Sequence, residues 1–151
     1  MEILVERATH KDIDSIIFLL KELYLELGEE SESVNFLNEE FLNRILNSEQ
    51  TEIFLAKTMD HELTGVLTLT ESQSIYAGGT YALLDEMYIK PEFRSSGIGT
   101  SFIDKIKELG KKRNWKRIDV TVPTEERWKR SITFYEKCSF VFTGSKLKLK
   151  L

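Results

Sequence analysis

The stretch from residue 81 to residue 122 constrains the fold most. An apolar, strand-like segment, "YALLDEMYI" (81–89), stops at Pro91, which has no N–H to donate to a neighbouring strand. A Ser- and Gly-rich turn, a helical pattern and a second strand-like segment, "WKRIDVTV" (115–122), follow. Two strands joined by a helix predict a right-handed parallel crossover. Apolar residues recur at helical spacing between them: Ile98, Phe102, Ile103, Ile106 and Leu109.

The rest of the chain alternates between strand and helix patterns. We expect strands at 3–9, 51–59 and 63–72, helices at 13–27, 38–47 and 126–138, and a final hairpin over 140–151. The resulting order is βααβββαβαββ. This order predicts a single α/β domain over residues 1–151, α+β in some schemes, with a mixed central sheet of about seven strands flanked by about four helices.

Composition restricts where the protein is expected to work. The chain is 41% hydrophobic and 30% charged, as in ordinary globular proteins. No apolar run approaches the roughly 20 residues of a membrane span, and the beginning of the chain lacks the pattern of a signal peptide. The single cysteine, Cys138, excludes an internal disulfide. We therefore expect a cytoplasmic protein with no membrane partner.

Charge is distributed unevenly along the chain. Residues 1–62 hold 15 acidic and 5 basic side chains, a net charge of −10, whereas residues 63–151 have a net charge of +6. One interpretation is a solvated surface without functional meaning. The other is a basic half that binds an anionic ligand and an acidic half that binds a cationic one.

The turn "EFRSSGIG" (92–99) has the residue types of an anion site. Backbone N–H groups at the start of a helix lack partners within the helix and attract anions. Glycines let the backbone approach a phosphate closely, while hydroxyl and guanidinium groups add donors. Two other phosphate motifs are excluded, because Phe102 occupies the place of the third glycine in G-x-G-x-x-G and no P-loop spacing occurs. The alternative is a purely structural turn.

Two segments together resemble the GCN5-related N-acetyltransferase (GNAT) superfamily. "LLDEMYIKPEFRSSGIGTSFIDKI" is similar to the R/Q-x-x-G-x-G/A acyl-coenzyme A signature of that family, and "SITFYEKCSF" is similar to its FYEKxGF segment. The predicted order of elements over all 151 residues also resembles the family's layout. The resemblance implies an acyl-CoA N-acyltransferase fold. It also implies direct transfer of an acetyl group from acetyl-CoA to a primary amine of a small molecule or an amino terminus.

The resemblance also implies where acetyl-CoA (coenzyme A) binds. Its pantetheine would pair with the backbone near Met87, Tyr88 and Ile89, and its pyrophosphate would bind the turn that begins at Arg94. The turn residues implied are Arg94, Ser95, Ser96, Gly97, Ile98, Gly99 and Thr100.

Three residues are catalytic candidates by the same resemblance. Tyr135 matches the tyrosine that protonates the leaving sulfur. Asp85 and Glu86 are candidates for the base that takes a proton from the amine; similarity to "LEDLYV" points to Asp85, and Glu86 is the other choice. Adjacent strand residues face opposite sides, so only one of them faces the substrate unless a bulge intervenes.

The sequence departs from the family pattern at Trp128, where the family often has an Asn. That departure puts an Asn-mediated contact with the cofactor in doubt. A second hypothesis, from another class of function, is a non-catalytic acyl-CoA-binding module that senses metabolic state or regulates a partner. A nucleic-acid partner is disfavoured, because the net charge is −4 and the C-terminal lysines alternate with leucines. Scattered His and Cys residues predict no metal site. A homodimer through the hairpin at 140–151 is compatible with the pattern.

Overall fold

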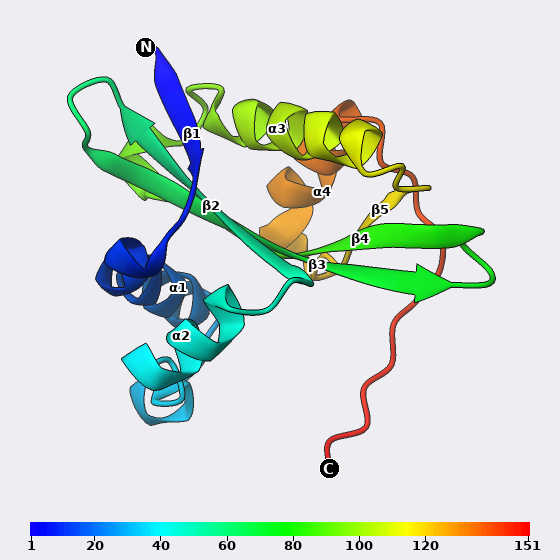
Figure 1. Ribbon diagram of the computed structural model, residues 1–151, viewed down its shortest axis with the longest axis horizontal. Helices are drawn as coiled ribbons and strands as arrows, with labels where there is room; N and C mark the ends of the chain where they lie inside the picture. Colours follow the sequence, from blue (N-terminus) through cyan, green and yellow to red (C-terminus); the bar gives the residue numbers. More distant parts are fainter. The chain divides into compact units, whose positions relative to one another are not determined.

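The computed structural model describes residues 1–151 and divides into two compact units, Met1–Asp119 and Val120–Leu151. Five strands and four α-helices follow one another along the chain (Figure 1). The strands are β1 (Ile3–Arg7), β2 (Thr51–Thr58), β3 (Leu63–Ser74), β4 (Gly79–Ile89) and β5 (Ile118–Val120). The helices are α1 (Ile13–Glu26), α2 (Glu39–Leu46), α3 (Ile98–Lys112) and α4 (Lys129–Lys137). None of these helices has the length and apolar character that a membrane span needs.

The five strands form one mixed sheet in the order β1-β2-β3-β4-β5. The pairs from β1 to β4 are antiparallel. At the β4 edge, Lys116 N donates to Thr80 O at 2.8 Å and Ala82 N donates to Arg117 O at 3.1 Å. The two bonds advance in the same direction along both segments, as in a parallel pair. The crossover from β4 through α3 to β5 therefore joins parallel neighbours, as the sequence predicts.

Helices cover both faces of this sheet (Figure 1). α1 and α2 lie on one face, against β2, β3 and β4, and α3 lies on the other. Successive strand residues point to opposite faces, so each strand supplies both cores. The core on the α1 and α2 face includes Ile16, Leu19, Leu42, Ile53, Leu55, Val66 and Tyr88.

Close packing of α3 depends on Gly65 in β3. A Cβ atom at this position would lie 2.7 Å from the carbonyl oxygen of Tyr88 and 3.3 Å from the ring of Phe102. Phe102 is fully buried. Only glycine leaves the space that this ring occupies, which brings α3 close to the paired strands β3 and β4.

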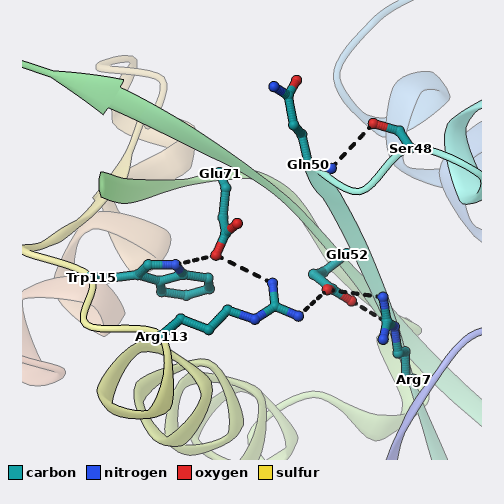
Figure 2. Close-up of polar contacts among 7 residues, drawn as sticks. All are labelled: Arg7, Ser48, Gln50, Glu52, Glu71, Arg113 and Trp115. Atoms are coloured by element: carbon teal, nitrogen blue, oxygen red, sulfur yellow. Dashed lines mark hydrogen bonds and ion pairs between the residues drawn. The ribbon is translucent and has the colours of Figure 1, made fainter. Parts of the chain in front are cut away.

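An ion-pair network around the buried carboxylate of Glu52 joins the C-terminal end of α3 to the sheet (Figure 2). The Glu52 side chain in β2 is only 1% exposed; its Oε2 lies 2.7 Å from Arg7 Nε and its Oε1 lies 2.5 Å from Arg113 Nη2. Oε2 has no hydrogen bond of good geometry, so the ion pair with Arg7 is what compensates its burial. Arg113 and the indole N–H of Trp115 also donate to Glu71 in β3. The network anchors the end of α3 opposite the Gly-rich turn.

The C-terminal part of the chain differs from the sequence prediction. The expected seven strands are five, because the predicted hairpin over 140–151 is wrong: residues 141–151 have no regular secondary structure. The leucines that alternate with lysines there are exposed, Leu147 by 94% and Leu149 by 86%. A two-stranded ribbon is marginal unless one of its faces is buried, and here the apolar face is not covered.

Other boundaries differ by a few residues. The strand expected at 115–122 is shortened to Ile118–Val120, and the helix expected at 126–138 begins as a 3₁₀ turn, Glu126–Trp128, before α4. A short 3₁₀ helix, Ser31–Val34, lies within the predicted loop 29–35.

Candidate active site

A bulge in β4 brings the two candidate carboxylates to one face of the sheet. Glu86 lies opposite Thr68 of β3, but Leu69 lies opposite Leu84, so Asp85 is the extra residue between them. Thr70 Oγ1 donates to Asp85 Oδ2 at 2.6 Å, and Thr68 Oγ1 donates to Glu86 Oε2. Thr68 and Thr70 share a face of β3 because they are two residues apart. The bulge therefore removes the restriction that only one of the two carboxylates faces a substrate.

Glu86 is the more firmly held of the pair. The hydroxyl of Tyr24, in α1, donates to Glu86 Oε1 at 2.7 Å. Burial and the neighbouring Glu86 raise the pKa of Tyr24, so this tyrosine keeps its proton and remains a donor. Hydroxyl groups donate to both oxygens of Glu86, so its side chain is held in one orientation. Glu86 is half-buried, whereas Asp85 is exposed.

The Gly-rich turn presents unpaired backbone N–H groups. α3 begins at Ile98, and Ser101 N donates to Gly97 O at 3.0 Å in the first helical bond. The N–H groups of the three preceding residues, 98–100, therefore have no acceptor within the helix, and no side chain caps it. Gly97 has φ 89°, and a Cβ atom there would meet nothing within 4 Å. Unpaired N–H groups beside open space at a helix start are the features of an anion site.

Arg94 and the hydroxyl of Ser96 make contacts within the protein. Arg94 donates from Nε to Ile89 O at 2.9 Å, and its Nη2 lies 2.6 Å from Glu26 Oε2 at the end of α1. The hydrogen bond to Glu26 raises the pKa of Arg94, which keeps its charge. The hydroxyl of Ser96 donates to the carbonyl of Phe93. In this conformation, Arg94 fixes the turn against α1.

The three β4 residues expected to bind pantetheine lie at the end of that strand. Met87, Tyr88 and Ile89 pair with 65–67 of β3 on one side. The hydrogen bonds from β4 to residues 116 and 117 lie at its beginning, at Thr80 and Ala82. The end of β4 leads directly into the Gly-rich turn, so the expected pantetheine and pyrophosphate positions follow one another along the chain.

Tyr135 lies in the second compact unit, Val120–Leu151. Tyr135 is 8% exposed, and the centroid of its ring lies 5.4 Å from the centroid of the Phe140 ring, edge to face. Burial, followed by the nearby Cys138, raises the pKa of Tyr135. The hydroxyl therefore stays protonated at neutral pH, as a general acid must.

Two residues that hold Glu86, Tyr24 and Thr68, are not among those predicted from the sequence. The helical spacing of apolar residues over 13–27 puts Tyr24 on the apolar face of α1, and its hydroxyl is the available signal, because it is a polar group on a face that is otherwise apolar. Thr68 stands in an apolar strand as a buried hydroxyl. Buried hydroxyls need partners, so each of them indicates a polar group on a neighbouring element.

Comparison with known proteins agrees with this fold. The profile of the acetyltransferase (GNAT) family matches residues 13–140. The chain therefore belongs to the GNAT acetyltransferase family. Over 59 residues it is 37% identical to the uncharacterized N-acetyltransferase MJ1207 of Methanocaldococcus jannaschii; this match covers 39% of the chain and 25% of that relative.

Solved structures share the fold at low sequence identity. An aminoglycoside acetyltransferase, HMB0005, from an uncultured soil metagenomic sample has a TM-score of 0.82 at 20% identity, covering 100% of this chain and 99% of that one. A ribosomal-protein-alanine N-acetyltransferase from Brucella melitensis biovar Abortus 2308 has a TM-score of 0.80 at 16% identity, covering 100% of both chains. A predicted acetyltransferase with acetyl-CoA from Clostridium acetobutylicum has a TM-score of 0.79 at 19% identity, covering 99% and 96%.

Proposed function

We propose that this protein transfers an acetyl group from acetyl-CoA to a primary amine of a small molecule or an amino terminus. The observation that carries the proposal is the β4 bulge, which places Asp85 and Glu86 on one face of a strand that leads to a helix start with uncapped N–H groups. Membership of the GNAT family supports the reaction class. Acetyl-CoA in a structure of the same fold supports the acyl donor.

The Gly-rich turn and the end of β4 would form the site for the acyl donor. The N–H groups of residues 98–100 and the open space beside Gly97 would hold the pyrophosphate, with Ser95 and Ser96 in the turn. Backbone groups of Met87, Tyr88 and Ile89 would pair with the pantetheine as an added strand does. Bound in this way, acetyl-CoA supplies a thioester whose carbonyl carbon accepts the amine.

Side chains of the protein would accept a proton from the amine and donate one to the leaving sulfur. An amine attacks only in its neutral form, and a carboxylate that takes the amine's proton makes this possible. Similarity in sequence points to Asp85, but Glu86 is the better oriented, so we assign the base to Glu86. As the new carbon–nitrogen bond forms and the carbon–sulfur bond breaks, the hydroxyl of Tyr135 would give a proton to the departing sulfur.

Thermal unfolding with and without acetyl-CoA tests the first half of the proposal. A ligand at 100 times its dissociation constant stabilises a protein by about 2.7 kcal/mol, which moves the midpoint by a few degrees. We expect this shift with acetyl-CoA and none with ATP or NAD. Release of free CoA thiol in the presence of primary amines tests the second half. Tight binding without turnover would instead favour a non-catalytic acyl-CoA-binding module.

A further inference from the structure

A row of aromatic rings leads away from Glu86. The ring centroid of Tyr24 lies 6.3 Å from that of Phe36, which in turn lies 5.8 Å from that of Phe41, edge to face. Tyr24 and Phe41 pack against the core, but Phe36 is 50% exposed. A large aromatic ring is thus left half open to solvent beside residues that are otherwise packed.

Tyr24 connects this ring to the candidate base. Its hydroxyl bonds Glu86 at 2.7 Å, while its ring is the neighbour of Phe36. A ligand with its amine at Glu86 and an apolar body extending along Tyr24 would therefore reach the exposed ring of Phe36. The ring centroids of Tyr24 and Phe36 are 6.3 Å apart, within the range of about 4.5–7 Å for an aromatic pair. An apolar body about the size of one ring would therefore extend from Tyr24 to Phe36.

The charge of the adjoining segment suits a cationic ligand. Three exposed carboxylates, Glu29, Glu30 and Glu32, precede Phe36 in the connection between α1 and α2. A primary amine is largely protonated in water and is attracted to such a surface before it loses its proton in the site.

We propose that the acetyl acceptor is a small cationic primary amine with an apolar body about the size of one ring, and that Phe36 selects for that body. The inference rests on the proposed function, because it names the substrate of the same site. Aromatic contact with Phe36 and charge contact with Glu86 act on two different parts of one molecule.

Two amines that differ in the ring alone test the proposal. 2-Phenylethylamine and ethylamine carry the same ammonium group, and kcat/KM for each is measured from the release of CoA thiol. We expect the wild-type protein to prefer 2-phenylethylamine at least about tenfold, in line with the selectivity that apolar pockets reach. Phe36→Ala should reduce this preference severalfold while turnover of ethylamine is retained.

Phe18→Ala is the matched control, because Phe18 on α1 is also 50% exposed. It should leave the preference unchanged. Turnover of both amines at similar kcat/KM, with no effect of Phe36→Ala, would overturn the inference and leave the acetyltransferase activity standing. No turnover of any primary amine would overturn the proposed function and this inference with it.

Discussion

The Tyr24 hydroxyl donates a hydrogen bond to Oε1 of Glu86 at 2.7 Å, between residues that are 62 positions apart in the sequence. The bond ties α1 to the bulge of β4. Because Thr68 donates to the other oxygen, the carboxylate is held from two sides. A group that takes a proton from a substrate needs such a fixed orientation.

Replacing Glu86 with Gln should lower the turnover number by about 100-fold, the lower range of what a general base contributes. The amide keeps the size of the side chain and an acceptor for Tyr24. Asp85→Asn is the comparison, and we expect it to lower turnover by less than tenfold. Steady-state kinetics with saturating acetyl-CoA measure both. The reverse ranking of the two variants would assign the base to Asp85.

A side chain at Gly97 should weaken the binding of acetyl-CoA. The Cβ atom of Gly97→Ala would point into the open space of the turn, where the pyrophosphate is proposed to bind. Because φ is 89° there, the substitution also strains the backbone by about 1–2 kcal/mol. Calorimetric titration should show at least a tenfold increase in Kd.

Gly78→Ala is the control that distinguishes backbone strain from a lost contact with the pyrophosphate. Gly78 has φ 84° and is equally open, but it lies in the turn between β3 and β4. We expect both variants to lose similar stability and Gly78→Ala alone to keep its affinity. Equal losses of affinity would show that strain, not the turn's contact with phosphate, explains the effect.

Tyr135→Phe should lower turnover much more than it changes the affinity for acetyl-CoA. The phenylalanine ring preserves the packing against Phe140 and removes only the proton donor. Separate measurement of kcat and of acetyl-CoA affinity distinguishes a lost proton donor from a lost binding contact. An unchanged kcat would remove Tyr135 from the mechanism.

Stability should fall as pH rises above about 10. Tyr24 and Tyr135 have pKa values raised above the ordinary tyrosine value, so above that value the unfolded chain loses these protons first. The folded state then binds more protons than the unfolded state, and the free energy of unfolding falls with a slope of up to 1.36 kcal/mol per pH unit for each tyrosine. Urea unfolding at a series of pH values should show a shallower decline for Tyr135→Phe than for wild type.

Arg113→Met should destabilise the protein by about 1–3 kcal/mol. The substitution removes one of the two cations that pair with buried Glu52, and a buried charge that loses a partner is costly. Lys112→Met makes the same kind of change at an exposed neighbour and should stay within about 0.5 kcal/mol of wild type. Urea denaturation measures both. Equal stabilities would mean that Arg7 alone compensates Glu52.

Local patterns determined most of the chain's elements. The helical spacing of apolar residues predicts the bounds of α1, α2 and α3 to within a few residues, and Pro91 predicts the end of β4. The turn is recognisable from its glycines. Gly97 has a φ of 89°, a conformation that favours glycine, so the residue type itself indicates the turn. These features depend on neighbours in the sequence, so a sequence is enough to predict them.

Side-chain partners that come from distant segments cannot be predicted from such local patterns. The ion pair between the guanidinium of Arg94 and Glu26 of α1 joins residues from separate segments, and no local pattern predicts it. The hairpin over 140–151 has the alternation of strands, yet no surface covers its leucines. Alternation reports which side of a strand is apolar and not whether another layer buries that side.

The sequence by itself therefore determined the family signature, the order of the elements and the presence of two adjacent carboxylates in one strand. The tertiary structure decided that Asp85 and Glu86 share a face, because the bulge arises from the pairing of β4 with β3. It also decided that Tyr24 reaches Glu86, because α1 packs on that face of the sheet. Register and packing are relations between separate segments, and they become fixed only when the whole core assembles.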